Sequence, residues 1–294
     1  MLPLRSEPRS ESALDVADWI ELQLILGPPW RVSEANAREF LDRRGLGDSF
    51  GSAVAGAIGV MRRRSGRLSK RYPIVPLAGG LARRDRSISW SQYAALLTIC
   101  CVDFGQAPAL LLEVTSLFEE YCEGVLRDLG GDAARAIHFG SPSRSGRPEG
   151  FSDAIRWLAH KLGLQAGSGY RDPRRNDGGV DLVSWRVLPD GRSYDVRLTQ
   201  CTIERSLLSK ARDIDVDQWV RWIGFAERPR IAIAVPYQVP LRSVEAREAT
   251  NLGSLVLDRL ALIESANEGE GFAVAAAHKL LGVSGISALV EAAQ

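Results

Sequence analysis

The sequence predicts a mixed α/β protein, with a helical N-terminal domain followed by a domain built on a small sheet. Helical periodicity dominates from about Ser12 to Cys101 and stops over Asp103 to Pro108. Beyond Pro108, several helical segments alternate with few strand-like ones, which favours a small sheet covered by helices on both faces. With 294 residues the chain is long enough for two domains, which we expect at residues 1–107 and 108–294.

The first expected domain contains helices and loops. Residues 14–26 carry apolar side chains at helical spacing, and Ser33 followed by Glu34-Ala35-Asn36 is typical of a capped helix start. A further helix is expected over residues 90–101, begun by Ser89 or Ser91. The arginine-rich residues 62–71 indicate a basic loop.

The second expected domain begins with a long helix, because Pro108 suits a first helical turn and Gly130-Gly131 marks an end. A Gly-, Ser- and Arg-rich loop follows. The later expected elements are helices over 152–162, 204–222, 255–263 and 272–281, a hairpin over 180–201, and a short buried strand over 230–235.

The hairpin carries the most informative pattern of the chain. Val180–Leu188 and Ser193–Cys201 are strand-like, and Pro189-Asp190-Gly191 between them is a turn signal. A symmetric loop would place Asp181 directly opposite Gln200, with Cβ atoms about 5 Å apart. A carboxylate and an amide oxygen there can share a hard cation such as Mg²⁺. A single β-bulge would break this register.

Charge gives no general attraction to nucleic acid. The formal net charge is +1, so a nucleic-acid site must be a local patch. Of the 37 basic residues only four are lysines. Arginine excess suits phosphate binding, but a GC-rich coding sequence produces the same bias. The four lysines are Lys70, Lys161, Lys210 and Lys279.

The cysteines and the N-terminus indicate a cytoplasmic protein. Cys100, Cys101, Cys122 and Cys201 form no CxxC pair and lie in apolar stretches, which is typical of buried free thiols in a reducing compartment. The first residues lack the pattern of a signal peptide. No apolar run approaches the length of a membrane span, so we expect no membrane association.

The segment Asp177-Gly-Gly-Val-Asp181-Leu-Val, a hairpin, and then Gln200-Cys201 resembles the core of the PD-(D/E)XK, or restriction-endonuclease-like, nuclease superfamily. It is most similar to the Mrr-like variant, whose pattern is Asp, a spacer and Gln-x-Lys. The resemblance covers about residues 111–263 and implies an αβα core with a small mixed sheet. Thr202 occupies the lysine position. A related bacterial defence subgroup carries a lysine ten residues after the glutamine, which here is Lys210.

The superfamily also has an acid on its first core helix, which corresponds here to Leu117-Phe118-Glu119-Glu120. Helical periodicity places Glu119 and Glu120 at opposite edges of the apolar face of this helix, and both could be solvated surface acids. An acid directly after Leu-Phe, as in the family pattern, favours Glu119.

The resemblance implies Mg²⁺-dependent (or Mn²⁺-dependent) hydrolysis of DNA phosphodiester bonds, in bacterial defence against foreign DNA. Asp181, Gln200 and Glu119 would form the metal site, and Lys210 would position water or stabilise charge. The alternative, favoured by Thr202, is a catalytically inactive nuclease-fold module that acts in DNA binding or complex assembly.

Other residues around the motif have two readings each. Asp177 before Gly-Gly is either a turn residue or an outer metal contact. Arg171, Arg174 and Arg175 would contact DNA phosphates or remain solvated loop residues. The three histidines are scattered, so we expect structural roles for them. Neutral net charge leaves room for a protein partner or a homo-oligomer.

Overall fold

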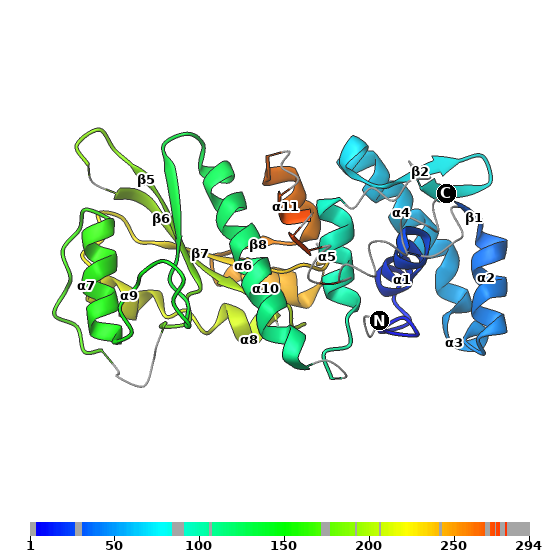
Figure 1. Cartoon of the computed structure of the whole chain (residues 1–294), viewed down its shortest axis with the longest axis horizontal. Coiled ribbons are helices and arrows are strands. Elements are labelled where there is room, and N and C mark those ends of the chain that lie inside the picture. Colours follow the sequence, from blue (N-terminus) through cyan, green and yellow to red (C-terminus); the bar gives the residue numbers. More distant parts are fainter. Residues whose placement is uncertain are drawn as a thin grey trace. The chain divides into compact units, whose positions relative to one another are not determined.

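The computed structural model describes residues 4–26, 31–83, 91–105, 108–171, 177–191, 193–205, 207–240, 243–267, 271–273, 275–276 and 280. It is a mixed α/β structure (Figure 1) with two compact units. One unit comprises Met1–Val114 with Gly269–Gln294, and the other comprises Thr115–Glu268. This division lies within the helix Pro108–Gly130.

Helices dominate the described part of the first unit. Its elements, in chain order, are α1 (Ala13–Leu26), β1 (Arg31–Val32), α2 (Glu34–Arg43), α3 (Gly47–Phe50), a 3₁₀ turn (Gly51–Ala53), α4 (Val54–Leu68), a second 3₁₀ turn (Ser69–Arg71), β2 (Ile74–Leu77), β3 (Gly80–Arg83) and α5 (Gln92–Cys101). Two expected helix starts are confirmed. Ser33 accepts a hydrogen bond from Asn36 N at 3.1 Å, and Ser91 accepts one from Ala94 N at 3.2 Å.

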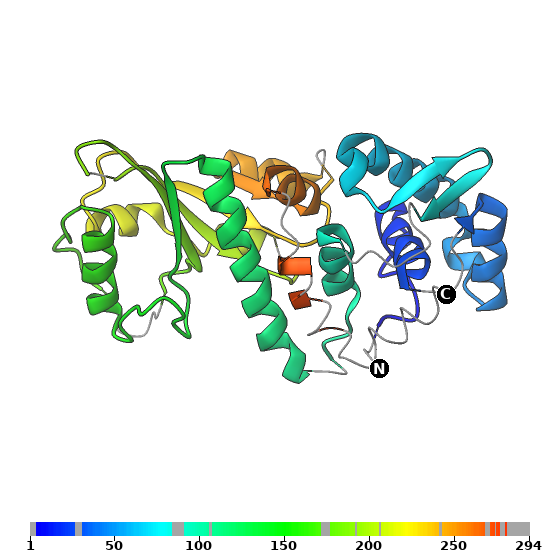
Figure 2. The same cartoon turned by 45° about the horizontal axis from the view of Figure 1, so that its top comes forward.

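The first unit is not purely helical, which corrects the prediction. It contains a three-stranded antiparallel sheet in the order β1-β3-β2, beside helices α1 and α4 (Figure 2). The β2–β3 hairpin turns at Gly79, whose φ is +77°. The strands are only two to four residues long, too short to produce a clear alternating pattern.

The prediction of a basic loop over residues 62–71 is also wrong, because α4 continues through Leu68. Arg64 is 1% exposed, and its Nη1 lies 2.8 Å from Asp18 Oδ1 and 2.8 Å from Glu21 Oε1. The hydroxyl groups of Tyr72 and Tyr93 also donate hydrogen bonds to Glu21. Helix α1 buries these acids, and Arg64 supplies the opposite charge that buried carboxylates need.

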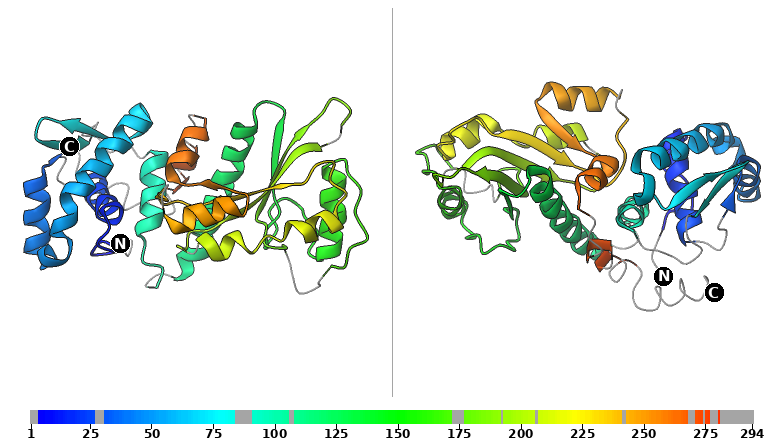
Figure 3. Two further views of the ribbon diagram at one scale, coloured as in Figure 1. Left: turned by 180° about the vertical axis from the view of Figure 1, so that it is seen from behind. Right: turned by 90° about the horizontal axis from the view of Figure 1, so that it is seen from above.

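The second unit contains a five-stranded mixed sheet, as expected. Its order is β4-β5-β6-β7-β8, antiparallel from β4 to β6 and parallel from β6 to β8. Helix α6 lies on one side of the sheet, and α8 and α10 lie on the other (Figure 3). The elements are α6 (Pro108–Gly130), β4 (Ala134–His138), α7 (Phe151–Lys161), β5 (Leu182–Val187), β6 (Ser193–Cys201), α8 (Leu207–Ala211), α9 (Val216–Trp222), β7 (Arg230–Ala234), α10 (Val244–Asn251), β8 (Ser254–Leu257) and α11 (Arg259–Ser265).

Several elements of this unit differ from the expectation. Strands β4 and β8 and helix α10 were not predicted, and the helix expected over 204–222 is two short helices. The helix expected over 255–263 begins only after Asp258, which caps α11 by accepting a hydrogen bond from Ala261 N at 3.0 Å. Of the helix expected over 272–281, residues 272–273, 275–276 and 280 are described and are helical, and the others lie outside the described residues.

The hairpin has the predicted register over Leu182–Ser184, through two deviations that cancel, whereas the predicted pair of Asp181 with Gln200 is not part of the ladder. Val187 pairs with Ser193, one position away from the symmetric loop, and a bulge follows between Ser184 and Arg186. Asp195, with φ of +49°, is the extra residue on β6. Beyond the bulge the ladder ends with Leu182 paired with Thr199, and Asp181, just before β5, donates its N–H to Thr199 O at 3.0 Å.

Helices α7 and α9 lie side by side and share one hydrophobic core with β5 and β6 (Figure 1). Trp219 of α9 stacks edge-on against Phe139 and Trp222, with ring centroids 5.5 Å apart in both pairs. The Trp219 indole N–H donates to Gly178 O at 3.2 Å, so this core also holds the loop before β5. No helix within the described ranges is both long and apolar enough to cross a membrane.

Arg64 provides a test of the buried charge network. Arg64→Met keeps most of the side-chain volume but leaves Asp18 and Glu21 without their cation, so we expect a loss of about 3–5 kcal/mol in the free energy of unfolding. The measurement is urea unfolding followed by tryptophan fluorescence. Arg38→Met, which breaks the exposed pair with Glu34, is the matched control and should cost less than about 1 kcal/mol. Equal losses in both variants would contradict the network.

Candidate functional site

The loop before β5 is a tight turn that requires glycine. Asp177 Oδ1 accepts a hydrogen bond from Gly179 N at 2.8 Å, which is the turn-forming role considered from the sequence. Gly178 and Gly179 have φ of +61° and +80°. A Cβ on Gly179 would overlap the carbonyl oxygen of Asp213. The loop therefore brings Asp177, Asp181 and Asp213 into one region.

Asp181 is fixed by four hydrogen bonds at the start of β5. Its N–H donates to Thr199 O at 3.0 Å, and its carbonyl accepts from Phe139 N at 2.7 Å and from Gly140 N at 2.9 Å. Its carboxylate Oδ2 accepts from Cys201 N at 2.7 Å. The backbone of the hairpin thus holds one carboxylate oxygen and leaves Oδ1 for other interactions.

The side-chain amide of Gln200 has a hydrogen-bonded nitrogen and an oxygen without a partner among the described residues. Its side chain is almost fully buried, and its Nε2 donates to Asp213 Oδ2 at 3.3 Å. Its Oε1 is buried without a hydrogen-bond partner among the described residues. A buried amide oxygen without a partner is costly in a stable fold and is typical of a position that receives a ligand.

Lys210 reaches the same region from α8. Its Nζ lies 3.7 Å from Asp213 Oδ2, the oxygen that also accepts from Gln200. Thr202, in the position where the resemblance expects lysine, is buried and its Oγ1 accepts from Glu204 N at 3.1 Å. Thr202 therefore forms a turn, and Lys210 is the lysine that lies beside Gln200 and Asp213.

The side chain of Glu119 on α6 is partly buried, whereas that of Glu120 is exposed. Glu119 Oε2 lies 3.0 Å from His138 Nε2 and 2.6 Å from Arg144 Nη2. A Cβ built on Gly140 would meet His138 Nε2 at 3.0 Å and Asp181 Oδ1 at 3.3 Å. His138 therefore stands between Glu119 and Asp181, and it is part of the site although the sequence indicated only a structural role.

Burial raises the pKa of Asp181 from its ordinary value of 3.8 to about 7. The hydrogen bond from Cys201 N opposes this change, the charges of Glu119 and Asp177 add to it, and the charge of Lys210 opposes it. Asp181 therefore lies close enough to Glu119, Asp177 and Lys210 for their charges to act on it. An acid in such surroundings has a strong affinity for a proton or a cation.

The donor set fits a divalent metal in part. Among the described residues, no three His, Cys, Asp or Glu side chains form a group that could hold a metal ion. Mg²⁺, however, commonly takes one or two protein carboxylates and completes its shell with waters and substrate phosphates. Asp181 Oδ1 and the unpaired Gln200 Oε1 fit that pattern. Glu119 fits it less directly, because His138 and Arg144 occupy its Oε2.

Of the arginines near the motif, the structure describes Arg171 and Arg147, and each has some contacts within the protein. Arg171 Nη2 donates to Gly167 O, while Arg174 and Arg175 lie outside the described residues. Arg147 is buried, with its guanidinium carbon 4.6 Å from the centroid of the Phe139 ring, and burial lowers its pKa. These contacts identify no phosphate-binding arginine.

Sequence reasoning missed His138 and Asp213. The short segment Ala134–Phe139 after Gly130-Gly131 was the signal for β4, whose pairing of His138 with Leu182 brings the histidine close to Asp181. The signal for Asp213 was the run Asp213-Ile-Asp-Val-Asp217, in which Asp215 caps α9 and Asp217 pairs with Arg228. Only Asp213 of these acids contacts Gln200.

Comparisons with protein-family models, with curated proteins and with solved structures found no match to the chain. Its function must therefore be inferred from the contacts of the site.

The pKa of Asp181 predicts a pH-dependent stability. Between pH 4 and 7 the folded chain keeps a proton that the unfolded chain has lost, so wild-type stability falls as pH rises through this window. Asp181→Asn removes this dependence while still accepting the hydrogen bond from Cys201. We expect it to exceed wild type by about 2–4 kcal/mol at pH 8 in EDTA, and by almost nothing at pH 4. Urea unfolding at several pH values measures this, and exposed Asp217→Asn is the control. A difference that does not change with pH would contradict a buried, proton-binding Asp181.

Gly179 provides a second test. Alanine there meets both left-handed strain of about 1–2 kcal/mol and overlap with Asp213. Gly191 has almost the same φ, +78°, with nothing within 4 Å of an added Cβ. Thermal unfolding should therefore show a clearly larger loss for Gly179→Ala than for the matched control Gly191→Ala. Equal losses would rule out the close approach of the loop to Asp213.

Proposed function

We propose that this chain is a Mg²⁺-dependent nuclease that hydrolyses DNA phosphodiester bonds, with Mn²⁺ as a replacement metal. The observation that carries the proposal is the buried Oε1 of Gln200, which has no hydrogen-bond partner among the described residues, at the same end of the hairpin as the Asp181 carboxylate with its raised pKa. Two oxygens with unused affinity for a cation, beside the lysine of α8, are the groups that metal-assisted phosphodiester hydrolysis needs.

Each residue of the site has a role in this proposal. Asp181 and Gln200 would hold Mg²⁺, which would supply positive charge at the scissile phosphate. Lys210, oriented by Asp213, would stabilise the developing negative charge or position the attacking water. Glu119 and His138 would control the protonation of Asp181 from its other side, because Glu119 raises its pKa and His138 borders its Oδ1.

The fold and the resemblance support the same proposal. Helices on both sides of a small mixed sheet agree with the αβα core of the PD-(D/E)XK superfamily. The hairpin register, the glutamine and the displaced lysine agree with its Mrr-like branch. Defence against foreign DNA is the context that this resemblance suggests.

One observation favours the alternative of an inactive nuclease-fold module for DNA binding or complex assembly. The usual lysine position is Thr202, which is committed to a turn, and Lys210 is paired with Asp213. An inactive module would bind DNA or a protein partner without Mg²⁺-dependent cleavage.

Cleavage of supercoiled plasmid DNA with Mg²⁺ or Mn²⁺ tests the proposal. We expect wild type to nick or linearise the plasmid, Asp181→Ala to abolish cleavage, and Lys210→Met to reduce its rate about 100-fold or more. Lys161→Met is the matched control, because Lys161 lies on α7, exposed and close to Trp157, and should leave the rate unchanged.

Three outcomes would contradict the proposal. Cleavage that survives Asp181→Ala comes from another site or a contaminant. Cleavage of RNA but not DNA would change the substrate class. Retained DNA binding without cleavage, in the presence of either metal, would favour the inactive module.

A further inference from the structure

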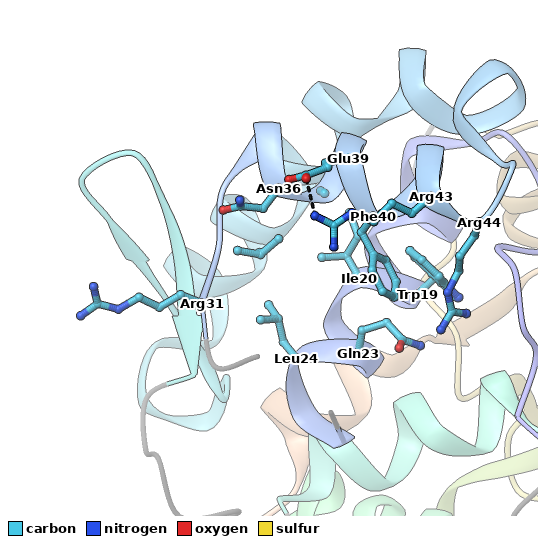
Figure 4. Close-up of a pocket in the computed structure, with 12 residues that line it drawn as sticks. Trp19, Ile20, Gln23, Leu24, Arg31, Asn36, Glu39, Phe40, Arg43 and Arg44 are labelled. Carbon is cyan, nitrogen blue, oxygen red and sulfur yellow. Dashed lines mark hydrogen bonds and ion pairs between the residues drawn. The ribbon is translucent and has the colours of Figure 1, made fainter. Parts of the chain in front are cut away.

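Helices α1 and α2 and strand β1 enclose a pocket in the first unit (Figure 4). Its volume is about 660 Å³, within the range typical of sites for small-molecule ligands. All of its lining residues lie between Trp19 and Arg44, so one short part of the chain builds it. The proposed nuclease site uses none of them.

One wall of the pocket is aromatic and contains an unpaired donor. Trp19 and Phe40 lie with ring centroids 5.3 Å apart and planes tilted by 35°. Trp19 is buried, and its indole Nε1 has no hydrogen-bond partner within the described part of the chain. Ile20 and Leu24 complete an apolar floor.

Cations gather at one end of this wall. Arg43 and Arg44 lie next to Phe40 and Trp19, whereas Arg31 lies at the opposite end on β1 (Figure 4). The guanidinium carbon of Arg44 is 4.6 Å from the Phe40 ring centroid and 5.8 Å from that of Trp19. Three arginines against the single acid Glu39 make the lining positive. A positive end beside an aromatic wall selects a ligand that is both anionic and planar.

We propose that this pocket binds a free nucleotide. Aromatic faces stack nucleobases, and arginine guanidinium groups pair with phosphate oxygens in a bidentate geometry. The base would lie against Trp19 and Phe40, and the phosphate would lie at Arg43 and Arg44. The amide of Gln23, which lines the pocket, is placed to contact a base edge. This inference does not depend on the proposed nuclease activity.

The chain offers a matched pair of variants. Arg43 and Arg38 are both on α2, and each pairs with a glutamate four residues earlier, Glu39 and Glu34. Only Arg43 lines the pocket. Arg43→Ala and Arg38→Ala therefore remove the same kind of surface ion pair and differ in the proposed ligand contact.

The experiment is isothermal titration of the full chain, in EDTA, with the four common ribonucleoside triphosphates and their monophosphates. We expect at least one to bind with a Kd below about 100 μM. Arg43→Ala and Phe40→Leu should each weaken binding about tenfold or more, whereas Arg38→Ala should not change it. Thermal unfolding of each variant checks that the fold is retained. Gln23→Leu, which removes only an amide that lines the pocket, should also weaken binding while leaving thermal unfolding unchanged.

The proposal would be overturned by any of four results. The first is that no nucleotide binds at about 1 mM, and the second is that wild type, Arg43→Ala and Phe40→Leu bind equally well. The third is that pyrophosphate binds as tightly as the nucleotide. The fourth is that only a 5′-phosphorylated oligonucleotide binds. Loss of binding in Arg43→Ala and Phe40→Leu with retention in Arg38→Ala supports it. Because no cleavage is measured, failure here leaves the nuclease test unaffected.

Discussion

The candidate site depends on the antiparallel pairing of β5 with β6. This pairing runs to Leu182 and Thr199, so it brings the side chains of Asp181 and Gln200 to the same end of the hairpin and lets Cys201 N donate to the Asp181 carboxylate at 2.7 Å. A change of register by one residue would turn one of the two side chains to the other face of the sheet. The bulge at Asp195 is therefore a necessary part of the hairpin, because it corrects the offset introduced by the turn.

Burial of charge is the second constraint, and the two units meet it differently. In the first unit Arg64 compensates Asp18 and Glu21 within hydrogen-bonding distance, and two tyrosines complete the network. Such a network is satisfied and stabilises the fold. In the second unit Asp181 has hydrogen-bond donors but no ion pair with a cation of the described residues, and its pKa rises to about 7. The contrast separates a structural charge cluster from one with affinity left for a ligand.

The neighbours of Asp181 come from distant parts of the chain. Glu119 is on α6, His138 on β4, Gln200 on β6, and Lys210 and Asp213 follow on and after α8. The sheet order β4-β5-β6 is what gathers them at one end of the strands. Tryptophans of α9 then hold the glycine loop against this end, since Trp219 donates to Gly178 O. The rigidity of the site therefore comes from the hydrophobic core beneath it.

Local patterns in the sequence determined the hairpin with its register at Leu182 and Thr199, the capped helices at Ser33 and Ser91, and the long helix from Pro108. These depend on turn chemistry, capping and side-chain period, which act between near neighbours. Only the tertiary structure decided that Arg64 is buried, that residues 134–138 and 254–257 are strands, and that His138 and Asp213 join the site. Those outcomes follow from pairing and charge compensation between residues far apart in the chain, which no local period records.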